Sequence, residues 1–210
     1  MRIALLVYDG MTALDAVGPY DSLSRLPEAD IVTVSPDGGP VTCGGGIVIQ
    51  AAAALAGVEA ADVLIAPGGM ASALRVVLGD SALMGWLRRI DQTSRYTCSV
   101  CSGALLLAAA GVLRNRTAAT HWRAQEALAA LGATPTADRV HVDGKYLTSG
   151  GVTAGIDMGL VLCGLLVGRE LGEAIELSMH HAPQPPFGTG DPATALTPAR
   201  RKLIEERLRN

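Results

Sequence analysis

The segment from Tyr96 to Gly111 passes directly from one kind of secondary structure to another. An apolar, strand-like run ends at Cys101, the small residues Ser102 and Gly103 follow, and a run of leucine and alanine continues the segment. This order predicts a strand, a sharp turn and a helix, with a nucleophilic side chain at the corner. Because a helix start presents free N–H groups and a partial positive charge, we expect a lowered pKa for the Cys101 thiol.

Short apolar runs alternate with helix-like segments along the whole chain. The pattern predicts strands at 3–7, 31–35, 47–50, 63–66, 96–100, 118–120, 140–142 and 146–148. It predicts helices at 15–26, 82–90, 102–110, 123–131, 153–168, 171–179 and 198–208. Such alternation indicates an α/β fold, a three-layer α/β/α sandwich with a mostly parallel sheet. At 210 residues the chain is most simply one domain, residues 1–210.

Charge and composition argue against several kinds of partner. The net charge of −3 argues against nucleic acid or an anionic membrane surface as the main partner. The first apolar stretch is too short for a signal peptide and breaks at Asp9-Gly10, and no apolar run reaches the length of a membrane span. Four cysteines without an export signal predict a reducing, cytoplasmic location.

Three segments of the predicted sheet end at the same edge, where parallel sheets bind their ligands. One leads to Asp15, one to Gly68 and Gly69, and one to Cys101. We therefore expect these residues to converge. A buried carboxyl beside a thiol would have a raised pKa and could act as a general acid, so Asp15 has a candidate role beyond that of a charge at a helix N-terminus.

Backbone N–H groups near the corner are candidates for binding a developing negative charge. Gly68 and Gly69 could supply such donors, and Ser102 could add its amide and its hydroxyl. These three residues form our predicted oxyanion or substrate-binding group. The simpler interpretation of the glycine pair is a turn that needs positive φ angles.

Cys98 and Cys101 have the C-x-x-C spacing of redox motifs, so a thioredoxin-like function has to be considered. Cys98 lies inside the predicted strand, however, which separates the pair by roughly 10 Å and points the two side chains to opposite faces. A disulfide needs Cα atoms within about 7 Å. We expect Cys43, Cys98 and Cys163 to be buried and inert, and no metal site, because no ligand cluster has suitable spacing.

Two further residues have open roles. His121 could form a Cys–His pair with the thiol, or it could be a structural histidine at a strand end. Asp157 lies among apolar residues of a predicted helix, where we expect it to satisfy buried backbone groups or a neighbouring loop.

Several segments together resemble the ThiJ/PfpI superfamily and, within it, the isonitrile hydratases. The resemblance covers nearly the whole chain and implies a flavodoxin-like fold with a nucleophile elbow, no cofactor, and a homodimer. The segments that carry it are the corner at Cys101, residues 15–19, Pro67-Gly68-Gly69, Thr120-His121-Trp122, residues 150–157 and the stretch Ala-Pro-Gln-Pro-Pro-Phe at 182–187.

The resemblance implies a reaction on a small molecule, the hydration of an isonitrile, R–N≡C, to an N-substituted formamide. Cys101 would attack the terminal carbon and form a thioimidate, and Asp15 would protonate that carbon and later activate water. Two positions depart from the pattern of the isonitrile hydratases. Ser102 stands where they tend to have threonine, and His180-His181 stand where they tend to have Glu-Tyr.

Two other functions remain open. The same thiol could support glyoxalase- or deglycase-like chemistry on small aldehydes. Similar segments also occur in the amidotransferase-like sensor domains of AraC-type regulators, which would make the chain a non-catalytic ligand-sensing domain. Those regulators continue into a DNA-binding domain, for which we expect no room before Asn210.

Overall fold

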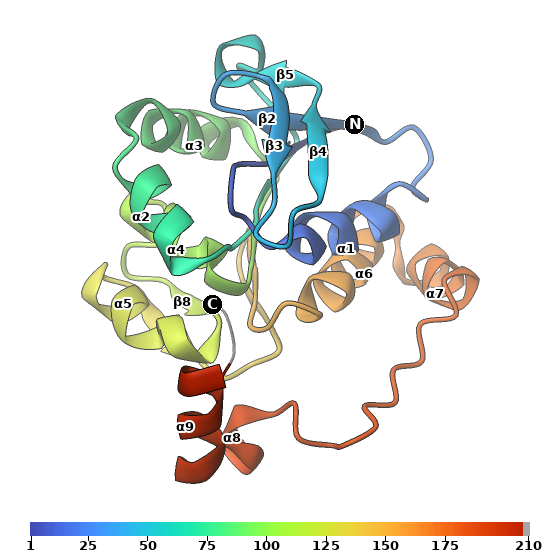
Figure 1. Cartoon of the computed structure of the whole chain (residues 1–210). Coiled ribbons are helices and arrows are strands. Elements are labelled where there is room, and N and C mark those ends of the chain that lie inside the picture. The colour runs from blue at the N-terminus through green and yellow to red at the C-terminus, as the bar shows by residue number, and fades with distance from the viewer. Residues whose placement is uncertain (208–210) are drawn as a thin grey trace.

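The computed structural model describes residues 1–207 and has a seven-stranded sheet at its centre (Figure 1). The strand order is β10-β11-β7-β6-β1-β2-β5, and all neighbours are parallel except the β10–β11 hairpin. The strands are β1 (Arg2–Leu6), β2 (Asp30–Ser35), β5 (Ala53–Ala54), β6 (Val63–Ala66), β7 (Tyr96–Val100), β10 (Val140–Asp143) and β11 (Tyr146–Ser149).

Helices cover both faces of this sheet, so the three-layer α/β/α sandwich with a mostly parallel sheet is confirmed (Figure 1). One face carries α1 (Ala13–Leu23), α6 (Ala154–Val167) and α7 (Arg169–Ser178). The other carries α2 (Ala71–Leu78), α3 (Ser81–Thr93), α4 (Ala104–Ala109) and α5 (Gln125–Ala130). No helix within residues 1–207 is long and apolar enough to cross a membrane.

Several short elements lie outside the main sheet. β3 (Gly39–Thr42) pairs with β4 (Val48–Ala51), and β8 (Thr117–Ala119) pairs with β9 (Thr134–Thr136). After α7 an irregular tail leads to α8 (Pro192–Ala195) and α9 (Pro198–Arg207), which lie near α5 (Figure 1). The predicted end of the last helix at residue 208 lies outside the described residues.

The sequence pattern missed β3, β5, β9, α2 and α8. The strands β5 and β9 have two and three residues, which is too short for a period of two to be recognised. The predicted strand at 47–50 exists as β4, but it belongs to a separate hairpin. The predicted helix 102–110 begins with the 3₁₀ turn η2 (Cys101–Gly103) and becomes α-helical only at Ala104.

Glycines allow α6 to approach β7 and α1 closely. A Cβ atom on Gly155 would lie 2.9 Å from Cγ1 of Val100, and one on Gly159 would lie 2.9 Å from Cβ of Ser22. Neither position leaves room for a side chain without a shift of its neighbours. This packing holds α1 against the strand that ends at Cys101.

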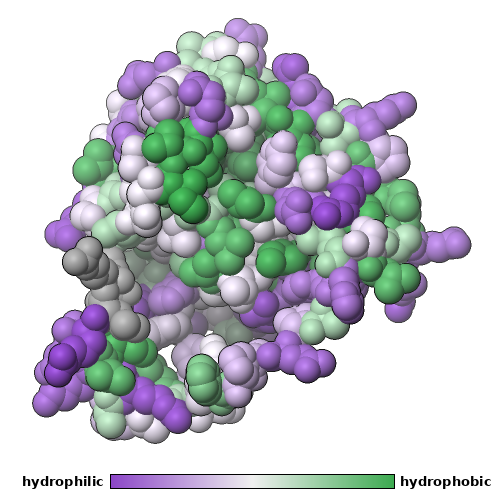
Figure 2. Space-filling view, turned by 45° about the vertical axis from the view of Figure 1, so that its right-hand side comes forward, coloured by the Kyte–Doolittle hydropathy of each residue, from purple (hydrophilic) through white to green (hydrophobic). Residues whose placement is uncertain are grey.

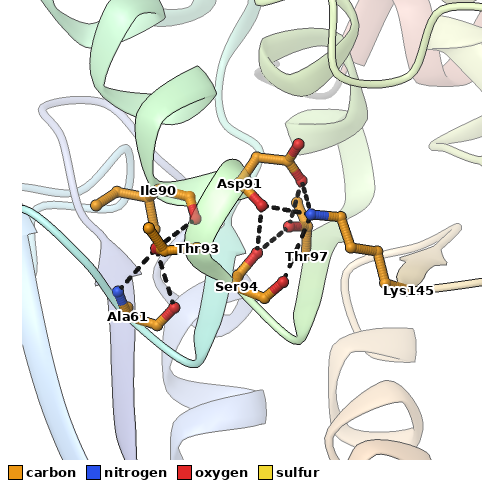
Figure 3. Close-up of polar contacts among 7 residues, drawn as sticks. All are labelled: Ala61, Ile90, Asp91, Thr93, Ser94, Thr97 and Lys145. Carbon is orange, nitrogen blue, oxygen red and sulfur yellow. Dashed lines mark hydrogen bonds and ion pairs between the residues drawn. The ribbon is translucent and has the colours of Figure 1, made fainter.

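A polar network joins the end of α3 to the starts of β7 and β11 (Figure 3). Thr97 Oγ1 donates to Asp91 Oδ1 at 2.7 Å, and Lys145 Nζ lies 3.0 Å from the same oxygen. Thr93 Oγ1 donates to the carbonyl of Ile90 at 3.0 Å. Because these contacts lie at the amino ends of the parallel strands, they stabilise the edge opposite to the one where ligands bind.

Candidate active site

Cys101 occupies the corner between β7 and the helix that follows. Its φ angle is +57°, a conformation that non-glycine residues rarely adopt, and its carbonyl accepts hydrogen bonds from Thr120 Oγ1 at 2.9 Å and from His121 N at 3.2 Å. A Cβ atom on Gly103 would lie only 2.1 Å from the carbonyl oxygen of Ala66, so the turn depends on that glycine. The corner therefore has the geometry of a nucleophile elbow.

The structure brings Asp15, Gly68, Gly69, Ser102 and Cys101 together at the carboxyl edge of the sheet. Asp15 lies in the first turn of α1, is completely buried, and accepts a hydrogen bond from Gly68 N at 3.0 Å through Oδ2. Gly69 N donates to Ser102 Oγ at 3.2 Å. Cys101 is 6% exposed, and its thiol lies close enough to Asp15 for each group to shift the pKa of the other.

In this structure both amides of the glycine pair already have hydrogen-bond acceptors. The amide of Gly68 is bound to Asp15 and that of Gly69 to Ser102, so neither is a free oxyanion donor in this structure. Neither residue has a positive φ angle. A Cβ atom on Gly68 would lie 2.5 Å from Ser102 Oγ, which shows that close approach, and not a turn with positive φ, requires glycine here.

The predicted lowering of the Cys101 pKa was wrong. Burial, followed by the Asp15 charge, raises the pKa of the thiol to about 12, although the amide and hydroxyl of Ser102 act in the opposite direction. The free N–H groups at the helix start stabilise a thiolate less than the apolar surroundings and the carboxylate destabilise it. Cys101 is therefore a thiol that needs a neighbouring proton acceptor.

Asp15 can be that acceptor. Burial raises its pKa from 3.8 to about 7, against the lowering effects of the Gly68 N–H group and of the Cys101 thiol. Its Oδ1 atom is buried and accepts no hydrogen bond from any residue that the structure describes. A proton can thus move from the thiol to the carboxylate, and the two groups titrate as a coupled pair.

Burial of the Asp15 carboxylate should lower the free energy of unfolding, and this effect can be tested. Because folding raises the Asp15 pKa from 3.8 to about 7, the folded protein holds this proton more tightly and loses stability as the pH rises from about 4 to about 7. Asp15→Asn lacks this titrating group. Between pH 4 and pH 8 we therefore expect the free energy of unfolding of the variant, relative to that of the wild type, to increase by up to about 4 kcal/mol.

Urea unfolding at several pH values measures this difference. Any stability cost of the asparagine amide that does not depend on pH cancels when the values at two pH values are compared. Asp21→Asn, which removes an exposed carboxylate from the same helix, is the control for the loss of one charge. A difference for Asp15→Asn that does not change with pH would show that the carboxyl is not destabilised in the folded protein.

The hydrogen bond between His121 and Cys101 comes from the backbone N–H group of His121. Its Nδ1 atom accepts a hydrogen bond from Arg123 N at 3.3 Å, and burial followed by the Arg123 charge lowers its pKa. The imidazole caps the next turn, η3 (Trp122–Ala124). The structure therefore favours the structural interpretation of His121 over a Cys–His pair.

The other candidates of the sequence analysis lie elsewhere. Cys43, Cys98 and Cys163 are buried free thiols with pKa values raised mainly by burial. Asp157 forms an ion pair with Arg139 and a hydrogen bond of 2.6 Å with Nε2 of His181, so it connects α6 to a neighbouring loop and to the start of the tail. Within residues 1–207, no cluster of His, Cys, Asp and Glu side chains could hold a metal ion.

Two residues at the site were missed by the sequence analysis. The Thr120 hydroxyl fixes the carbonyl of Cys101, and Tyr8 lies fully buried beneath the Pro67–Gly69 loop. Thr120 lies in one of the segments that carry the family resemblance, but the sequence analysis assigned it no role, and a tyrosine at a strand end is common in any α/β protein.

A cysteine at a strand–helix corner, opposite a buried carboxyl on a parallel sheet, defines an α/β protein with a nucleophile elbow. The sequence model of the DJ-1/PfpI family matches residues 1–164. The chain therefore belongs to the DJ-1/PfpI family, and the resemblance to the ThiJ/PfpI superfamily is confirmed.

Individual relatives agree with this assignment. An isonitrile hydratase from Pseudomonas putida is 37% identical over 195 residues, which cover 93% of this chain and 85% of the relative. A ThiJ/PfpI family protein of known structure from Pseudomonas syringae is 36% identical, with a TM-score of 0.92 over 98% of this chain and 86% of that one. The HTH-type transcriptional regulator CdhR from Pseudomonas aeruginosa is 34% identical over 80% of this chain, which corresponds to 50% of the regulator.

Proposed function

We propose that this protein is a cofactor-independent isonitrile hydratase, which converts R–N≡C and water to the formamide R–NH–CHO. The observation that carries the proposal is the pairing of the Cys101 thiol with the buried Asp15 carboxyl, whose pKa of about 7 lets it take up and return a proton. The similarity to a relative named isonitrile hydratase supports the choice of substrate. The four free thiols fit a reducing, cytoplasmic location, which is part of the proposal.

The first step forms the covalent intermediate. The Cys101 thiol gives its proton to the Asp15 carboxylate, and the thiolate attacks the terminal carbon of the isonitrile. Asp15 then protonates that carbon, so the product is the thioimidate R–N=CH–S–Cys101. The thiol proton has moved to carbon by way of Asp15, which is again a carboxylate.

The second step consumes water. Asp15 removes a proton from a water molecule as the water oxygen attacks the thioimidate carbon, and the nitrogen receives this proton. The remaining hydroxyl of the tetrahedral intermediate collapses to the carbonyl, the C–S bond breaks, and the sulfur takes the hydroxyl proton. The formamide leaves, and the thiol and carboxylate are restored.

The value of kcat/KM should rise with pH and then level off. The active form of the pair carries one proton, which is the state between the Asp15 pKa of about 7 and the Cys101 pKa of about 12. We therefore expect kcat/KM to rise about tenfold per pH unit below 7 and to stay level up to pH 9. A profile that falls between pH 6 and pH 8 would mean that a doubly protonated pair is the active form.

Turnover of cyclohexyl isocyanide tests the function directly. Purified protein should produce N-cyclohexylformamide continuously, as followed by chromatography with mass detection. Turnover of methylglyoxal without formamide formation would replace the proposal with glyoxalase- or deglycase-like chemistry. Binding of the isonitrile without either product would favour a ligand-sensing domain, which the regulator relatives make the second candidate.

We also propose that the protein forms a homodimer. Side chains of α1 and α6, which pack against each other, expose apolar surface at Leu14, Val17, Val161 and Leu165. Hydrophobic side chains are gathered on the side of the molecule that carries these helices (Figure 2). Exposed apolar patches of this kind commonly mark protein interfaces.

Sedimentation at micromolar concentration should give twice the mass of the chain. We expect Val17→Asp, which adds a charge to this surface, to weaken the dimer at least about tenfold. Arg88→Asp on the opposite side of the sheet is the control. A wild type that sediments as a monomer would contradict the proposal.

A further inference from the structure

Tyr8 is a buried titratable group that the mechanism above does not use. It follows β1 by two residues, its side chain is 1% exposed, and its hydroxyl donates to the carbonyl oxygen of Pro67 at 3.1 Å. Burial, and then the charges of Asp15 and Cys101, raise its pKa well above the usual value, so it remains a phenol and a donor at any working pH.

The carbonyl of Pro67 and the N–H group of Gly68 belong to one peptide unit. Because a trans peptide is planar, its C=O and N–H groups point in opposite directions and turn together. One end of this unit accepts from Tyr8, and the other end donates to Asp15 Oδ2 at 3.0 Å. A hydrogen bond on the carbonyl also polarises the amide and strengthens it as a donor.

We propose that Tyr8 is a positioning residue, which holds the Pro67–Gly68 peptide so that its N–H group faces the Asp15 carboxyl. The proposal deepens the function proposed above and rests on it for its catalytic meaning. Tyr8 itself touches neither substrate nor reacting atoms in this scheme. It acts on the reaction through the hydrogen bond that stabilises the Asp15 carboxylate.

The direction of the effect follows from the surroundings of Asp15. The Gly68 N–H group lowers the pKa of Asp15, so weakening this donor should raise it. Among residues 1–207, the titratable groups coupled to the carboxyl are Cys101 and Tyr8 itself. Asp157 of the neighbouring helix α6 is paired with Arg139 and His181 instead.

Tyr8→Phe removes the hydroxyl and keeps the ring. With the side-chain carboxyls of aspartate labelled with carbon-13, the Asp15 signal is identified by its loss in Asp15→Asn, and its shift is followed with pH. We expect the midpoint in Tyr8→Phe to lie about half a pH unit above that of the wild type. The midpoint of the rise of kcat/KM with pH should move upward by the same amount, and the plateau value of kcat/KM should change less than threefold.

Tyr146→Phe is the matched control, because Tyr146 is a buried tyrosine of β11 away from the Pro67–Gly68 peptide. In this variant the titration midpoint of Asp15 should equal that of the wild type. A folded Tyr8→Phe variant with an unchanged Asp15 midpoint overturns the proposal.

If that variant does not fold, the same titration of Asp15 is made on protein with 3-fluorotyrosine in place of Tyr8. Its more acidic hydroxyl should move the midpoint downward, and no movement would overturn the proposal. The titration is informative even if the protein does not hydrate isonitriles.

Discussion

Replacing Cys101 by alanine is expected to lower isonitrile hydration by at least about 10⁴-fold, to the uncatalysed rate, as when an enzyme loses its nucleophile. The thiol is the group that the elbow presents to Asp15, and no other cysteine of the chain lies at this corner. Formamide formation from cyclohexyl isocyanide measures the loss, after circular dichroism has shown that the variant is folded.

The other cysteines supply matched controls. Cys43→Ala, Cys98→Ala and Cys163→Ala, each made singly, should keep most of the activity, because these thiols are buried away from the corner. Loss of activity in Cys98→Ala, with activity retained in Cys101→Ala, would show that Cys101 is not the nucleophile.

Asp15→Asn should lower kcat by about 10³- to 10⁴-fold, the upper half of the range for losing a positioned acid. Asparagine keeps the size of the side chain and can still accept the hydrogen bond from Gly68, but it cannot take the thiol proton or return it to carbon. Circular dichroism of the variant at the assay pH separates this loss of activity from a loss of folded protein.

His121→Gln is the control for this change. Its imidazole accepts a hydrogen bond from Arg123 N, and His121 donates to Cys101 from its backbone, so we expect a loss of about tenfold or less, through packing. An inactive His121→Gln together with an active Asp15→Asn would replace the Cys–Asp mechanism with a Cys–His mechanism.

The sequence was sufficient to predict the corner at Cys101 and the meeting of Asp15 with it. Both follow from chain order, because the carboxyl ends of parallel strands share one edge of the sheet. Neither the separate β3–β4 hairpin nor the pairing of β8 with β9 could be predicted. Short strands carry little periodic signal, and their partners are chosen by tertiary packing.

The electrostatics of the site could not be predicted from local pattern. The sequence shows a helix start after Cys101, which favours a thiolate, but not the burial that raises its pKa. Likewise, the occupied amides of Gly68 and Gly69 depend on where the side chains of Asp15 and Ser102 point. Such three-dimensional contacts also explain why Tyr8 gave no signal.

The most direct test of the account is to detect the covalent intermediate. Wild-type protein mixed with saturating cyclohexyl isocyanide and quenched with acid during turnover should gain the mass of one isonitrile per chain. The peptide that contains Cys101 should carry it, and the adduct should disappear as the isonitrile is used up and formamide accumulates. Formamide formation at the wild-type rate by Cys101→Ala, or a wild type that yields neither adduct nor formamide, would contradict the account.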